Sequence, residues 1–139
     1  MKFTFAGAVL AFASFVSATN VRYDTTYDNG SGDMTTVSCS DGPNGLITRY
    51  GFQTFGDIPT FPNIGAAQAI AGWNSPSCGT CWKLTYQGKS IFVTAIDHAG
   101  DGFNIAEKAM NTLTNGQAVA LGKISATATQ VDASNCGLN

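Results

Sequence analysis

The clearest alternation of hydrophobic and polar residues lies in the second half of the chain. Residues 81–86 and 90–97 are rich in β-branched and aromatic side chains, and the turn-forming residues 87–89 separate them. The pattern predicts two adjacent strands. Because both faces of the second strand carry apolar residues, we expect it to lie in the centre of a sheet.

Weaker patterns predict the remaining elements. We expect two early strands at residues 21–27 and 34–39, followed by a long ordered loop at residues 40–62. We also expect two short helices at residues 64–71 and 106–113, and a last strand at residues 123–132. Strands and helices do not alternate regularly along the chain. An all-β fold with short helices, closed into a barrel, fits this order best.

The first residues have the pattern of a secretory signal peptide. Lys2 supplies a positive charge, residues 3–16 are almost wholly apolar, and Val16-Ser17-Ala18 provides small residues for cleavage. A membrane anchor is the alternative, but the apolar stretch is shorter than the roughly 20 residues that a spanning helix needs. We therefore expect residues 1–18 to be removed and residues 19–139 to form one secreted domain.

The composition of this domain indicates which classes of binding partner it favours. Cleavage after residue 18 leaves 121 of 139 residues, with six basic and nine acidic side chains and a net charge of −3. No Lys or Arg cluster remains, which argues against nucleic acid. Gly, Ser, Thr and Asn are plentiful, so the surface is expected to be neutral and polar, as suits sugars better than ions.

Four cysteines give the chain its most distinctive motif. Cys78 and Cys81 form a Cys-x-x-Cys pair, while Cys39 and Cys136 stand alone. Zinc binding and thioredoxin-like redox chemistry are alternatives, but zinc lacks further ligands at suitable spacing and the motif leads into a strand rather than a helix. In a secreted domain two structural disulfides are expected, with three possible connectivities.

Several motifs together resemble the cerato-platanin family across nearly the whole mature chain. They are Val21-Arg22-Tyr23-Asp24, Ser38-Cys39-Ser40, Ile70-Ala71-Gly72-Trp73, the stretch from Ser75 to Lys83, Ile96-Asp97, Gly102-Phe103-Asn104 and the stretch from Gln130 to Cys136. The resemblance implies a six-stranded double-psi β-barrel, related to barwin and to the first domain of expansins and secreted by filamentous fungi. It also implies pairing of Cys39 with Cys78 and of Cys81 with Cys136.

Candidate binding chemistry centres on Asp97, which follows the predicted central strand beside a glycine-rich loop. The alternative is that Asp97 only caps a turn. In related barrel hydrolases the resemblance implies a second Asp after the next loop, where this chain has Asn104. An amide cannot act as general acid or base, so this pair favours binding of a sugar over its hydrolysis.

Other residues near this position have two interpretations. Tyr23 and Asp24, on the first strand, are candidates to stack on a sugar and accept its hydroxyls, although a strand Tyr often only packs. Asp101 is expected to be a solvated turn residue and His98 to have no catalytic role. Trp73 and Trp82 are expected to pack against the disulfides.

Three functions remain open at this stage. The first is a non-hydrolytic, expansin-like protein that binds chitin, N-acetylglucosamine oligomers or other β-linked glycans through Asp97, Asn104, Tyr23 and Asp24. Such a protein would also elicit plant defence, with a plant receptor as a candidate partner. The second is a self-assembling, surface-active wall protein, for which the long loop offers Phe52, Phe55, Phe61 and Ile64 as exposed apolar area. The third is a weak glycoside hydrolase. No cofactor, metal or membrane span is expected.

Overall fold

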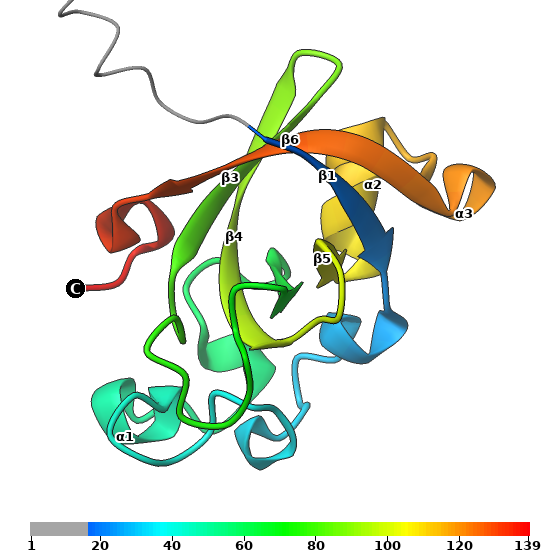
Figure 1. Cartoon of the computed structure of the whole chain (residues 1–139). Helices are drawn as coiled ribbons and strands as arrows, with labels where there is room; N and C mark the ends of the chain where they lie inside the picture. Colours follow the sequence, from blue (N-terminus) through cyan, green and yellow to red (C-terminus); the bar gives the residue numbers. More distant parts are fainter. Residues whose placement is uncertain (1–16) are drawn as a thin grey trace, which may run out of the picture.

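A computed structural model describes residues 17–139, in which six strands close into a barrel (Figure 1). Around the barrel the order is β1-β5-β2-β4-β3-β6, and β6 returns to β1. The strands are β1 (Ser17–Tyr23), β2 (Ile64–Ala67), β3 (Cys81–Tyr86), β4 (Lys89–His98), β5 (Phe103–Ile105) and β6 (Lys123–Val131). The predicted closed six-stranded β-barrel is confirmed.

The strand pairing combines local hairpins with long-range contacts. β3 and β4 form an antiparallel hairpin, and β6 adds antiparallel to the other edge of β3. β1 pairs parallel with β5, and β2 pairs parallel with β4. Strands far apart in the sequence therefore meet at one side of the barrel, where the ends of β1, β2, β4 and β5 lie together.

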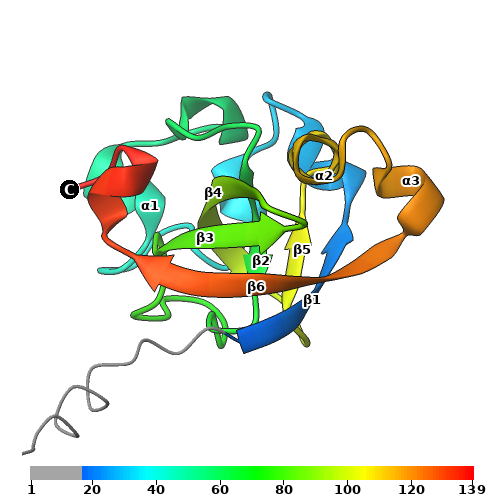
Figure 2. The ribbon, with the colours of Figure 1, turned by 90° about the horizontal axis from the view of Figure 1, so that it is seen from above.

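Within residues 17–139, three short α-helices accompany the barrel: α1 (Leu46–Tyr50), α2 (Glu107–Thr114) and α3 (Ala118–Leu121). Figure 2 shows α2 end-on beside the strands, with α3 at the edge of the molecule. The buried face of α2 includes Met110 and Leu113. The Asp28 carboxylate accepts hydrogen bonds from the backbone N–H groups of Glu107 and Lys108, at 2.8 and 2.9 Å, and so caps the first turn of α2.

The Ala-rich segment predicted as a helix at residues 64–71 forms strand β2 instead. Tertiary packing explains the error. A Cβ atom on Gly65 would lie 2.5 Å from the backbone oxygen of Asn104 and 2.6 Å from the Cα atom of Ile105. The small residues of this segment thus let β2 fit between β4 and β5, and this overrides the helix propensity of alanine.

The two early predicted strands were only partly right. The first ends at Tyr23 and continues as a 3₁₀ helix at Thr25–Asp28, while residues 34–39 form a 3₁₀ turn at Met34–Thr36 instead of a strand. Asp24 and Asp33 each accept a hydrogen bond from a backbone N–H two residues later, which stabilises the turn conformation.

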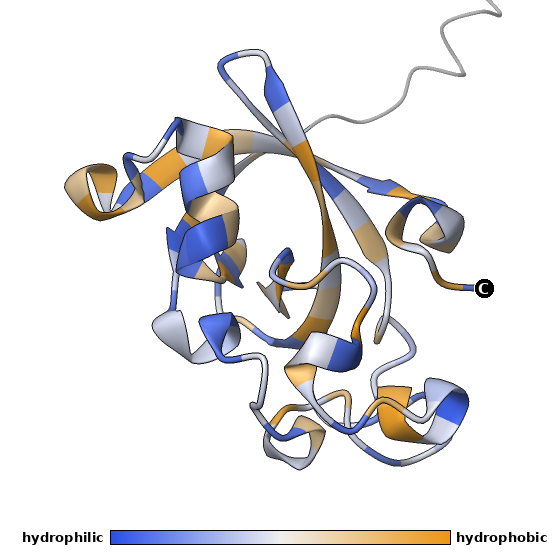
Figure 3. Cartoon of the chain, turned by 180° about the vertical axis from the view of Figure 1, so that it is seen from behind, coloured by the Kyte–Doolittle hydropathy of each residue, from blue (hydrophilic) through white to orange (hydrophobic). Residues whose placement is uncertain are grey.

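The segment predicted as a long loop, residues 40–62, contains helix α1 and a 3₁₀ helix at Phe55–Asp57, and the apolar side chains predicted to be exposed are not. Phe55 and Ile64 are buried, and Phe52 and Phe61 pack partly buried against the core. This contradicts the exposed apolar area on which the self-assembly hypothesis rested. The exposed large apolar residues in the described chain are Trp73, Val119 and Leu121. Figure 3 shows hydrophobic residues running along β4 and also on α3.

Both disulfides have the connectivity that the resemblance implied. Cys39 pairs with Cys78 and Cys81 with Cys136, over sequence separations of 39 and 55 residues. The two cysteines of the Cys-x-x-Cys motif therefore belong to different bridges. One bridge ties the long N-terminal segment to the turn before β3, and the other ties β3 to the C-terminal residues.

The predicted signal peptide lies mostly outside the described residues. Its last two residues, Ser17 and Ala18, begin β1 and pair with Ala128 and Thr127 of β6. Cleavage after Ala18 stays a prediction. From residue 17 onwards no helix is long and apolar enough to cross a membrane.

Candidate functional site

A β-bulge sets the position of Asp97 at the end of β4. Gly65 of β2 pairs with Ala95, but the next residue, Ala66, pairs with Asp97, so Ile96 is an extra residue on β4. An extra residue changes the direction of the side chains that follow it. Asp97 therefore lies on the same sheet face as Ala66. In a regular strand Ile96 would take that position.

The register places Asp97 and Asn104 in one row across the barrel wall. Ala66 pairs with Asp97 on one side and with Asn104 of β5 on the other, and Asn104 pairs with Arg22 of β1. Asp97 and Asn104 lie two strands apart. At about 4.8 Å between neighbouring strands, their backbones are about 10 Å apart. The structure thus brings the two predicted residues to one face, on strands that are neighbours of β2.

The Asp97 carboxylate is largely occupied by bonds within the protein. One oxygen accepts hydrogen bonds from the backbone N–H groups of Ser38 and His98, both at 2.9 Å, and the other accepts one from the Tyr27 hydroxyl at 2.8 Å. Asp97 is half-buried. Since a carboxylate has about four acceptor positions, one remains for a ligand.

Tyr27 completes this arrangement from the other side. Its side chain is buried, and burial raises its pKa well above the usual range, with further contributions from the nearby charges of Asp97 and Asp24. The tyrosine is therefore a hydrogen-bond donor at neutral pH. Sequence reasoning missed Tyr27 because its contact with Asp97 spans 70 positions in the chain.

Asn104 has a free amide. Its side chain is half-buried and makes no hydrogen bond to another of residues 17–139. The amide has both donor and acceptor capacity, which sugar hydroxyls and acetamido groups require. Of the four predicted binding residues, Asn104 has the greatest unused hydrogen-bonding capacity.

Tyr23 and Asp24 lie at the same end of the barrel, where β1 meets β5. Tyr23 pairs with Ile105 and packs partly buried against the core. The Asp24 backbone N–H donates to the carbonyl of Ile105 at 2.8 Å, and its carboxylate accepts from the Thr26 N–H at 2.9 Å. Both residues thus have structural roles, and Asp24 keeps one carboxylate oxygen without a partner among the described residues.

Asp101 has more defined contacts than a solvated turn residue. It accepts a hydrogen bond from the Asn20 amide at 2.9 Å and forms an ion pair with Arg22 at 3.4 Å. The Asn20 hydrogen bond, followed by the Arg22 interaction, lowers the pKa of Asp101. This pair holds the glycine-rich loop against β1, beside the row that contains Asn104.

His98 contacts the backbone of the preceding loop. Its Nδ1 lies 2.6 Å from the carbonyl oxygen of Ile70, and its side chain is exposed. No group of three or more His, Cys, Asp or Glu side chains gathers as a metal site in the part of the chain that the structure describes.

Of the two tryptophans, Trp73 is not packed as predicted. Trp73 is 62% exposed, and its indole N–H donates to Asp41 at 2.7 Å. Trp82 is partly buried and meets Phe103 edge to face at 5.4 Å between ring centroids. Trp82 also lines a pocket, described below, that sequence reasoning did not find.

The chain is similar in sequence and structure to several fungal proteins. The family model described as Cerato-platanin matches residues 19–138. The heat-stable 19 kDa antigen of Coccidioides posadasii is 49% identical over 146 residues, covering 99% of each chain. The crystal structure of cerato-platanin 2 from M. perniciosa is 56% identical, with a TM-score of 0.84 over 88% of this chain and all of that one.

Two further structures show how far the likeness extends. The solution structure of the fungal elicitor Cerato-Platanin is 42% identical, with a TM-score of 0.73, and covers 84% of this chain and 95% of its own. An expansin from Clavibacter michiganensis matches at a TM-score of 0.57 with 15% identity, over 85% of this chain and 51% of that one. The expansin match shows a shared fold alone.

Proposed function

Because the chain belongs to the cerato-platanin family and has an expansin-like barrel, we propose that it is a secreted, non-hydrolytic protein that binds chitin, N-acetylglucosamine oligomers or related cell-wall glycans. The row from Asp97 to Arg22 is the proposed contact surface, with Tyr23 and Asp24 at its edge. The family is also the reason to propose an extracellular or cell-wall location.

The observation that carries this proposal is the unequal pair formed by Asp97 and Asn104. Glycoside hydrolysis by the usual route needs two carboxyl groups beside the scissile bond, one of them free to transfer a proton. Here Asn104 is an amide, and the Asp97 carboxylate already accepts three hydrogen bonds. Binding with hydrogen bonds, without proton transfer, fits both residues. Any loosening of polysaccharide would then come from binding alone.

We further propose that the protein acts on plants as an elicitor. Support comes from the related solution structure, which is described as that of a fungal elicitor. Infiltration of the purified protein into leaves should raise an oxidative burst, and the same dose after reduction and alkylation of both disulfides should not. An equal response to the reduced protein would argue against recognition of the folded barrel.

A glycan array with the secreted protein tests the binding proposal directly. Hits among chitin oligomers or other β-linked glycans are expected, and Asn104→Ala should weaken their binding about five- to thirtyfold, since it removes one or two hydrogen bonds of roughly 1 kcal/mol each. Asn139→Ala is the matched control, because Asn139 is exposed, is not among the residues with positive φ, and makes no side-chain hydrogen bond within residues 17–139. If the Asn104→Ala variant bound glycans as tightly as the original protein, Asn104 would not be part of the binding site.

Hydrolysis can be excluded in the same samples. Incubation with chitin, cellulose and xylan should release no reducing ends above the level of a buffer blank. Release that disappears in Asp97→Asn would establish the hydrolase alternative and overturn the non-catalytic proposal. Asp97→Asn is preferable to Asp97→Ala because an amide oxygen can still accept from Tyr27 or Ser38.

A further inference from the structure

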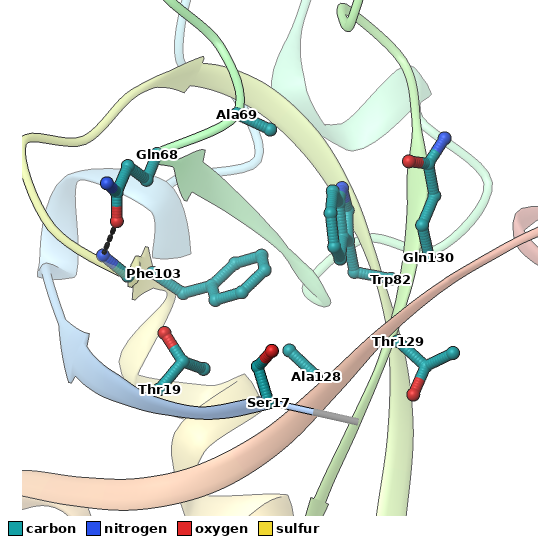
Figure 4. Close-up of a pocket in the computed structure, with 10 residues that line it drawn as sticks. Ser17, Thr19, Gln68, Ala69, Trp82, Phe103, Ala128, Thr129 and Gln130 are labelled. Carbon is teal, nitrogen blue, oxygen red and sulfur yellow. Dashed lines mark hydrogen bonds between the residues drawn. The ribbon is translucent and has the colours of Figure 1, made fainter. Parts of the chain in front are cut away.

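The mouth of the barrel contains a pocket that is separate from the row of Asp97 and Asn104. Its volume is about 480 Å³, within the usual range for small-molecule sites. The lining comes from β1, β3, β5, β6 and the segment after β2 (Figure 4): Ser17, Thr19, Gln68, Ala69, Trp82, Gly102, Phe103, Ala128, Thr129 and Gln130. We propose that this pocket binds one ring of an uncharged, hydroxyl-bearing ligand, namely the terminal sugar of a neutral glycan.

Two aromatic rings form the apolar wall of the pocket. Trp82 and Phe103 face each other in Figure 4 and meet edge to face, with centroids 5.4 Å apart. The Trp82 indole N–H already donates to the Thr80 hydroxyl at 2.8 Å. The polar edge of the indole is therefore satisfied within the protein, and its ring offers apolar surface on which the C–H face of a sugar can pack.

Polar groups surround this wall and have unused hydrogen-bonding capacity. The Gln68 carbonyl accepts from the Gly102 backbone N–H at 3.0 Å, which fixes that side chain and leaves its NH₂ group free. The side chains of Thr19 and Gln130 make no hydrogen bond within residues 17–139. Thr129 lies between Ala128 and Gln130 on β6, and its side chain points away from the pocket (Figure 4). Hydroxyl and amide groups around an aromatic surface match the edge of a sugar ring.

The lining argues for a neutral ligand. None of the ten lining residues has an ionisable side chain. Asp101, which adjoins Gly102, is held by Asn20 and Arg22. If the chain begins at Thr19 after processing, the lining loses Ser17, and the cationic α-amino group of Thr19 is added to it. A charged ligand would lack a side-chain counter-ion among the lining residues.

Strand geometry separates the pocket from the proposed contact row. Successive side chains of a strand point to opposite faces, so Phe103 faces the pocket while Asn104 belongs to the row, and Thr19 alternates with Asn20 in the same way. The two sites thus lie on opposite faces of the β1–β5 pair. The pocket proposal shares its ligand class with the proposed function and rests on it in that respect, but not on the same residues.

Heteronuclear NMR titration of the secreted protein with chitotetraose and cellotetraose distinguishes the two sites. We expect shifts of the Trp82 indole N–H and the Gly102 amide. Shifts confined to Ser38, His98 and Asn104 would overturn the pocket and keep the proposed function. Shifts confined to the pocket would overturn the row as the contact surface, and no shift at millimolar sugar would overturn both.

The sugar affinity of variants with substitutions in the pocket tests the assignment of the ligand to this pocket. Trp82→Leu should weaken binding about tenfold by removing the stacking surface, whereas Trp73→Leu, at the exposed tryptophan outside the pocket, should leave it unchanged. Gln130→Ala changes an exposed side chain that makes no hydrogen bond to the described part of the chain, so the variant should fold normally and bind about two- to fivefold more weakly. Unchanged affinity in both Trp82→Leu and Gln130→Ala would overturn the proposal.

Discussion

Asp97 joins three segments of the chain through one carboxylate. It accepts hydrogen bonds from Ser38, from His98 and from the Tyr27 hydroxyl, and so holds the N-terminal turns against the end of β4. The candidate binding residue is therefore also a structural residue. Loss of sugar binding in an Asp97 variant is informative only when the fold is shown to be intact.

Because Tyr27 donates one of these hydrogen bonds, the contribution of this connection to stability is expected to be lost at alkaline pH. Its pKa is raised in the folded protein by burial and by Asp97, so the folded state holds the proton more tightly than the unfolded state. The stabilisation is complete below the unfolded pKa of about 10 and is lost as the pH rises above it. The free energy of unfolding should fall above pH 10, and absorbance at 295 nm should show one tyrosine ionising only with unfolding.

Tyr27→Phe provides the matched variant. It removes the hydroxyl but keeps the ring, which contacts Phe55 at 6.1 Å between centroids. At pH 7 the variant should be less stable by about 1 to 2 kcal/mol, and its decline above pH 10 should be shallower than that of the original protein. The same steep decline in both proteins would show that Tyr27 is not the group responsible.

At the scale of single residues, Asp97 was predicted from its place at the end of a strand and Asn104 from the family resemblance, and the structure puts both on one face of the sheet. Sequence reasoning could not find the Tyr27 contact or the Trp82 and Phe103 pocket. Those pairings join positions 70 and 21 residues apart, and they depend on strand order and on the bulge at Ile96. Local patterns contain no information about either.

Among the elements, β2 shows how packing overrides local preference. The strands at 81–86 and 90–97, the helix at 106–113 and the last strand were predicted within one or two residues of their observed bounds. The alanine-rich segment was predicted as a helix because its composition favours one. Its use as a strand depends on the close approach of β5, which no local pattern reveals.

Gly65→Ala tests this explanation of β2. The added Cβ atom would meet backbone atoms of Asn104 and Ile105 at 2.5 and 2.6 Å, and these cannot move without opening the β2–β5 pairing. We expect a loss of about 2 to 3 kcal/mol in the free energy of unfolding, measured by urea denaturation.

Gly72→Ala is the control for that change. No atom lies within 4 Å of the corresponding Cβ position, and Gly72 is not among the glycines with positive φ. It should keep or slightly raise the stability. Equal effects of the two substitutions would contradict the role of close strand approach.

For the whole molecule, two disulfides add to the stability that barrel closure provides. Loops of 39 and 55 residues correspond to about 4 kcal/mol each on the chain-entropy model. Replacing either cysteine pair with serine should therefore lower the free energy of unfolding by about 3 to 5 kcal/mol. A change below 1 kcal/mol for either pair, measured by guanidinium denaturation, would show that the bridge is dispensable.

Closure of the barrel depends on β1, which pairs with both β5 and β6. Removing residues through Ala18 loses only the pairs of Ser17 and Ala18 with β6, and every pair with β5 remains. Both residues are exposed. A chain that begins at Thr19 should therefore unfold within about 1 kcal/mol of one that begins at Ser17.

A chain that begins at Tyr23 should behave differently. It loses all pairing with β6 and the fully buried Val21, which leaves this edge of β6 unpaired and β5 with only the Tyr23–Ile105 pair. We expect no cooperative urea transition and poor dispersion of its amide NMR signals. A cooperative transition at the original midpoint would show that the barrel does not need β1 for closure. Strong destabilisation of the Thr19 chain would contradict the small contribution expected from the pairs of Ser17 and Ala18 with β6.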